Sequence, residues 1–120
     1  MNRIFVSKKF DKEVKKLSFT DKTLMDFVET AHSWDDLGSF LFKARMGLDN
    51  QGKRGSARVI ISAKVGDKYF YLHSYKKGKK ETLTKEDERQ FKIVSKILHN
   101  LKDDQLMKLV ESGEMREVKK

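Results

Sequence analysis

Two β-rich segments joined by a tight-turn dipeptide constrain the fold of this chain more than any other feature. The segment SARVIISAKV, 56–65, is rich in β-branched residues, and KYFYLHSY, 68–75, is strongly aromatic. Between them stands Gly66–Asp67, a dipeptide typical of two-residue hairpin turns. The chain from 56 to 75 is therefore predicted to form a β-hairpin.

A third β segment, SFLFKARM at 39–46, precedes this hairpin. Apolar residues at 40, 42, 44 and 46 alternate with the residues at 41, 43 and 45, of which the last two are the cations Lys43 and Arg45. Because successive side chains of a strand point to opposite faces, one face of this strand should be apolar and the other basic. We expect the strand to pair beside the hairpin.

Helical patterns occupy most of the remaining chain, after a short β-type run at 3–6. Thr20 is a plausible N-cap of the second helix, and SWDDLGS at 33–39 interrupts that helix. The apolar stripe expected for the third helix is Phe91, Val94, Leu98 and Leu101. The spacing of apolar residues predicts helices at 8–17, 18–32, 85–101 and 103–112.

The order β-α-α-β-β-β-α-α indicates an α+β domain. We expect helices packed on one face of a small antiparallel sheet, with the other face partly open and basic. A chain of 120 residues is long enough for one domain with a single core, so 1–120 is interpreted as one domain.

The absence of cysteine excludes a disulfide framework and a thiolate metal site. The first residues, MNRIFVSKKF, contain no apolar signal core, and no segment approaches the length of a membrane span. These features favour a cytoplasmic protein with no membrane partner.

The positive charge of the chain is concentrated in one segment. Between residues 43 and 80 there are eleven lysines and arginines and two aspartates, so this window carries the whole net charge of +9. A charge that served only solubility would be spread along the chain. Its concentration favours a face that binds a polyanion, with nucleic acid as the first candidate.

Strand parity suggests how these cations could converge. Lys43 and Arg45 are two residues apart and point the same way, and Arg58 lies near the start of the next strand. Lys76–Lys80 begins where the last strand ends. On neighbouring strands these groups could bind a phosphodiester, the guanidinium groups bidentately and the ammonium groups as point charges. The plainer alternative is a rim of solvated cations.

Histidines and tyrosines offer little direct evidence of catalysis. The three histidines, His32, His73 and His99, are scattered and are more typical of structural or surface positions. His73 has the same strand parity as the tyrosines at 69, 71 and 75, which could stack on bases but are more often core residues. Tyr75, beside the basic segment, is the best candidate for an exposed one.

The acidic pairs Asp35–Asp36 and Asp103–Asp104 are interpreted as turn and cap residues, and we expect neither a metal nor a cofactor. A ribonuclease is still possible, because RNA carries its own nucleophile, the 2′-hydroxyl. Such an enzyme must align that hydroxyl, assist its deprotonation and stabilise charge on the phosphate. Clustered cations lower one another's pKa, so a crowded lysine could act as acid or base.

The basic segments resemble the RelE/HigB-like toxins of bacterial toxin–antitoxin modules. The resemblance lies in a K-x-R strand, Lys43-Ala-Arg45; a basic loop, Gly52-Lys53-Arg54-Gly55-Ser56-Ala57-Arg58; and Tyr75-Lys-Lys77-Gly-Lys-Lys80-Glu-Thr-Leu83. The tail DDQLMKLVESGEMREV resembles the C-terminal extension of one RelE-like subfamily, so residues 103–118 are expected to be a helical extension. The resemblance covers nearly the whole chain.

The resemblance implies a RelE-type fold and cleavage of mRNA in the ribosomal A site, by attack of the 2′-hydroxyl without a metal. It also implies inhibition by a cognate antitoxin, of helix-turn-helix type. By position, Arg58 would stabilise the transition state, and Lys43 and Arg45 would bind the phosphate and activate the 2′-hydroxyl. Tyr75 would stack or transfer a proton. The remaining implied residues are Lys77 and Lys80 for RNA or the leaving group, and Lys53, Arg54, Lys76 and Lys79 for RNA binding.

The sequence departs from the family pattern in ways that leave the acid and base open. Ser56 stands where many relatives have a second glycine, and Gly78 stands where they often have a polar residue. Relatives of ParE type share the fold and inhibit DNA gyrase, which is one alternative function. A non-catalytic or degenerate RNA-binding module is another.

Overall fold

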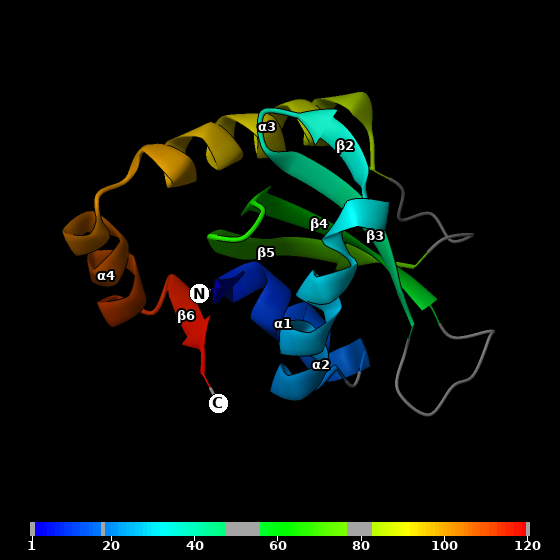
Figure 1. Cartoon of the computed structure of the whole chain (residues 1–120), viewed down its shortest axis with the longest axis horizontal. Helices are drawn as coiled ribbons and strands as arrows, with labels where there is room; N and C mark the ends of the chain where they lie inside the picture. Colours follow the sequence, from blue (N-terminus) through cyan, green and yellow to red (C-terminus); the bar gives the residue numbers. More distant parts are fainter. Residues whose placement is uncertain (1, 18, 48–55, 77–82, 120) are drawn as a thin grey trace.

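A computed structural model describes residues 2–17, 19–47, 56–76 and 83–119 of the chain (Figure 1). The expected α+β class is confirmed, and the expected elements are present in the expected order, with two additional strands and a 3₁₀ segment. The elements are β1 (Arg3–Ser7), α1 (Lys8–Leu17), α2 (Asp21–Phe27), η1 (Val28–Ser33), β2 (Asp35–Gly38), β3 (Leu41–Gly47), β4 (Ser56–Lys64), β5 (Lys68–Tyr75), α3 (Lys85–Asn100), α4 (Asp103–Glu111) and β6 (Met115–Val118).

The strands form one sheet in the order β2-β3-β4-β5-β1-β6. The predicted hairpin of β4 and β5 and its pairing with β3 are present and antiparallel. The sheet is mixed, however, rather than purely antiparallel, because β1 runs parallel to β5. The strands that were not expected, β2 and β6, are the two short edges, paired with β3 and β1.

Helices cover both faces of the sheet, which corrects the expectation of one covered face. One core lies between the sheet and α1, α2 and η1, and includes Phe10, Leu24 and Tyr71. The other lies against α3 and α4 and includes Leu98 and Leu106. The physical reason is in β1, β4 and β5, where consecutive apolar residues are buried, so that both faces of these central strands need cover.

The helix starts follow their capping signals. The Thr20 hydroxyl accepts a hydrogen bond from the Thr23 N–H, and Thr84 forms a capping box with Asp87 at the start of α3. The inward stripe of α3 differs from the expected one, because Val94 is 41% exposed and Ser95 is fully buried. Serine is tolerated at this buried position because its hydroxyl forms hydrogen bonds inside the protein.

A chain of hydrogen bonds joins α3 to the turn between β2 and β3. The Ser95 hydroxyl donates to the Ser39 carbonyl at 2.7 Å and lies 2.6 Å from the Ser62 hydroxyl. Ser62 in turn lies 2.8 Å from His99 Nε2. The turn itself holds Ser39 and Phe40 at positive φ, 57° and 63°, which is costly for residues with side chains. The network therefore fixes a strained turn that leads directly into β3.

The expected helical extension of 103–118 consists of α4 followed by strand β6. In β6, Arg116 forms hydrogen bonds with the carboxylates of Asp11 and Asp21, and Glu117 pairs with Arg3 at 3.0 Å. The end of the chain is thereby fastened to α1, α2 and β1. In the described part of the chain, no helix is both long and apolar enough to cross a membrane.

Candidate functional site

A row of three residues crosses β3, β4 and β5, the adjacent central strands of the sheet (Figure 1), near one end of each strand. The strand register places Arg45 of β3 opposite Arg58 of β4, and Arg58 opposite Tyr75 of β5. Directly opposed residues share a face of the sheet, with Cβ atoms about 4.5–5.5 Å apart. Two guanidinium groups so placed repel each other and present a concentrated positive charge to an anion.

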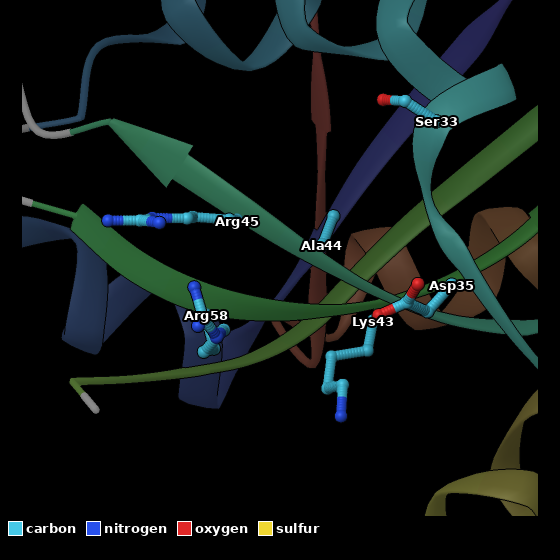
Figure 2. A pocket seen from close by; sticks show the side chains of 6 residues that line it. All are labelled: Ser33, Asp35, Lys43, Ala44, Arg45 and Arg58. Atoms are coloured by element: carbon cyan, nitrogen blue, oxygen red, sulfur yellow. The ribbon is translucent and has the colours of Figure 1, made fainter. Parts of the chain in front are cut away.

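Lys43 and Asp35 lie in the next row, since the β2–β3 register places them opposite each other. With Ser33, Ala44, Arg45 and Arg58 they line a cavity of about 290 Å³. Figure 2 shows the Lys43 and Arg58 side chains on the same side of the strands and Asp35 approaching from β2. Lys43 and Arg58 are half-buried, whereas Arg45 and Asp35 are exposed, so the cavity is open to a ligand.

A β-bulge in β5 determines which tyrosine joins this site. The β4–β5 register shifts between Ile60 and Ile61, which changes the alternation of side chains beyond the shift. The expectation that His73 and Tyr75 point the same way as the other two tyrosines is therefore wrong. Tyr69 and Tyr71 belong to the core under α1 and α2, whereas Tyr75 lies on the opposite face with Arg58.

The expectation that Tyr75 is exposed is wrong, because aromatic contacts hold its ring and leave it only 9% exposed. Its ring stacks on His73 at 5.7 Å between centroids, and His73 stacks on Phe91 of α3 at 5.6 Å. Burial raises the pKa of the Tyr75 phenol above its ordinary value, although attraction from Arg58 opposes this. Near neutral pH the hydroxyl is therefore protonated and can donate.

Glu13 of α1 fixes the orientation of His73. Its Oε2 lies 2.9 Å from His73 Nδ1, and its Oε1 accepts a hydrogen bond from the Ser74 N–H. Burial alone would raise the pKa of Glu13, but the close contact with His73, the hydrogen bond from the Ser74 N–H and attraction from Lys9 lower it overall. His73, itself mostly buried, is thus held in place to stack on the Tyr75 ring.

The structure brings together Lys43, Arg45 and Arg58, the three sequence-predicted cations that belong to strands, and aligns Tyr75 with them. Lys76 follows β5 and is exposed. The other predicted site residues lie outside the described residues: Lys53, Arg54, Lys77, Lys79 and Lys80.

Sequence reasoning missed Asp35, which it assigned to a turn. The sequence offers only an acidic residue eight positions before Lys43. That spacing places the two residues opposite each other only if the chain reverses tightly between them. That reversal depends on the Ser39–Phe40 turn, whose residues do not favour positive φ. Within the described ranges there is also no cluster of three or more residues suited to hold a metal.

A family model described as the RelE toxin of the RelE/RelB toxin–antitoxin system matches residues 2–118. The match spans every element from β1 to β6 and includes the whole cavity. A search among curated proteins found no match.

Proposed function

The chain belongs to the RelE toxin family, and from this premise we propose that it is a ribosome-dependent mRNA endonuclease that inhibits translation. The observation that supports the proposal most is the shared cavity of Lys43, Arg45 and Arg58. Three cations from two neighbouring strands form a rigid receptor for a phosphodiester, because strands hold side chains more firmly than loops do.

The proposed reaction uses the nucleophile of the RNA itself. The guanidinium groups bind the non-bridging oxygens of the scissile phosphate, and Arg58 stabilises the charge that grows on them in the transition state. The 2′-hydroxyl attacks phosphorus and expels the 5′-oxygen, which yields a 2′,3′-cyclic phosphate and a 5′-hydroxyl without a metal. Tyr75, protonated and beside Arg58, can donate a proton to the departing oxygen, whereas its buried ring is already stacked on His73 and leaves little surface for a base.

The remaining basic residues are assigned to recruitment. Lys53, Arg54, Lys76 and Lys79 would contact the backbone of messenger or ribosomal RNA, and Lys77 and Lys80 would bind RNA or assist the leaving group. Binding of this kind weakens steeply with salt. Membership of the family implies a cognate antitoxin, and we propose an antitoxin of helix-turn-helix type that covers or distorts the cationic cavity.

Controlled expression tests the proposal. Induction from a tight promoter should stop growth and create new mRNA 5′ ends, mapped by primer extension. Arg58→Ala should abolish both effects with the fold intact. Arg89→Ala is a matched control, because Arg89 is exposed on α3 and pairs with Glu86 away from the cavity. Growth arrest with intact transcripts would reject the proposal, and accompanying DNA damage would favour gyrase inhibition.

A further inference from the structure

One acidic residue stands in the otherwise cationic cavity. Asp35 lines it with Lys43, Arg45 and Arg58, and the strand register places its side chain on the same face as Lys43. The neighbouring Asp36 is opposite Phe42, so its side chain starts from the other face of the strand. Two adjacent aspartates therefore occupy different surroundings.

The fold uses Asp36 but does not use the carboxylate of Asp35. Asp36 Oδ1 accepts a hydrogen bond from the Gly38 N–H at 2.8 Å, which helps to close the turn. In the parts of the chain that the structure describes, no residue forms an ion pair or a hydrogen bond with the Asp35 carboxylate, although Lys43 lies opposite it. A stabilising cross-strand ion pair therefore does not explain this residue.

A carboxylate in a phosphate-binding cavity also opposes the ligand. Its negative charge repels the phosphate that the neighbouring cations attract. An acidic side chain at this place is suited to accept a hydrogen bond from a donor of the substrate. The donor closest to a scissile phosphate in RNA is the 2′-hydroxyl of the preceding ribose, whose oxygen must attack the phosphorus.

We propose that Asp35 is the general base that accepts the proton of the attacking 2′-hydroxyl, an inference that rests on the proposed endonuclease function. The O2′–H bond breaks and its proton passes to the carboxylate, while O2′ forms a bond with phosphorus. The P–O5′ bond breaks, and the departing oxygen takes a proton from the Tyr75 hydroxyl, the donor proposed above, or from water. A carboxylate is ready for this role at neutral pH, whereas an ammonium group must first lose a proton.

The test compares Asp35→Asn with Asp36→Asn, which makes the same charge change on the adjacent residue. Single-turnover cleavage of ribosome-bound mRNA by the full chain would be followed from pH 4 to 9. Asp35→Asn should lower the cleavage rate about 10²–10³-fold at neutral pH and remove the loss of rate on acidification. RNA binding should be unchanged or tighter, because a negative charge has been removed.

Asp36→Asn should cleave at nearly the wild-type rate with the wild-type pH profile, and Asp35→Glu should recover part of the rate lost in Asp35→Asn. Thermal unfolding of each variant should show a folded chain, since Asp35 is exposed.

Cleavage by Asp35→Asn at the wild-type rate would overturn the inference and leave the endonuclease proposal standing. A loss confined to certain codons would also overturn it, because it would make Asp35 a reader of bases. Failure of the wild-type protein itself to cleave would overturn both.

Discussion

Replacement of Ser95 by alanine tests the hydrogen-bond network that joins α3 to the β2–β3 turn. The substitution removes the bond to the Ser39 carbonyl, at 2.7 Å, and the contact with Ser62, at 2.6 Å. Ser95 and Ser62 are both fully buried, so water cannot replace the lost partner. Two lost hydrogen bonds and a poorly satisfied carbonyl correspond to about 2–4 kcal/mol of unfolding free energy.

Urea denaturation of the purified chain would measure this loss, with Ser112→Ala as the control. The Ser112 hydroxyl also donates to a carbonyl, that of Leu109, but it is exposed, and its removal should cost less than about 0.5 kcal/mol. In a double-mutant cycle, Ser62→Ala and Ser95→Ala should be coupled by about 0.5–3 kcal/mol. If Ser95→Ala and Ser112→Ala lower the free energy of unfolding by equally small amounts, and Ser62→Ala and Ser95→Ala show no coupling, the network does not stabilise the fold.

Two further predictions concern titration and the C-terminal strand. Burial, together with repulsion from Lys64 and Lys68, lowers the pKa of His99 to about 4, so the unfolded chain binds more protons below pH 6.5. The stability due to neutral His99 should be complete above pH 6.5 and should fall by about 1–2 kcal/mol towards pH 4, allowing for its partial exposure. His99→Gln should flatten that part of the stability–pH curve, and an unchanged slope would contradict the assignment. Arg116→Ala should lower the free energy of unfolding by about 1–2 kcal/mol, because its carboxylate partners on α1 and α2 both lose a charged hydrogen-bond donor. Denaturant unfolding would measure this loss, with Lys22→Ala, at an exposed ion pair, as the control. An equal or smaller loss for Arg116→Ala would show that these ion pairs do not stabilise the fold.

Local signals in the sequence were sufficient to identify the central elements. The turn at Gly66, the alternation around Lys43 and the capping residues Thr20 and Thr84 each act over a few residues, and the structure has the elements that they predict. Strand parity also predicted that Lys43, Arg45 and Arg58 could share a patch, as they do in the cavity.

Features that depend on distant pairing were missed. The edge strands β2 and β6 are four residues long, and each exists because a neighbouring strand offers it a partner. The bulge that turns Tyr75 towards Arg58 is a property of the β4–β5 pair, and a single strand read alone gives no sign of it. Asp35 was overlooked for the same reason, since its position is defined only by its register with Lys43.

We propose that the cavity cations stabilise the transition state of RNA cleavage. Single-turnover cleavage of ribosome-bound mRNA by wild-type, Arg58→Ala and Arg89→Ala proteins tests it most directly, with the product ends identified chemically. We expect a 2′,3′-cyclic phosphate and a 5′-hydroxyl. Arg58→Ala should lower the rate about 10²–10³-fold, with a much smaller change in RNA affinity, and Arg89→Ala should alter neither. Equal rates for Arg58→Ala and the wild type would contradict the claim.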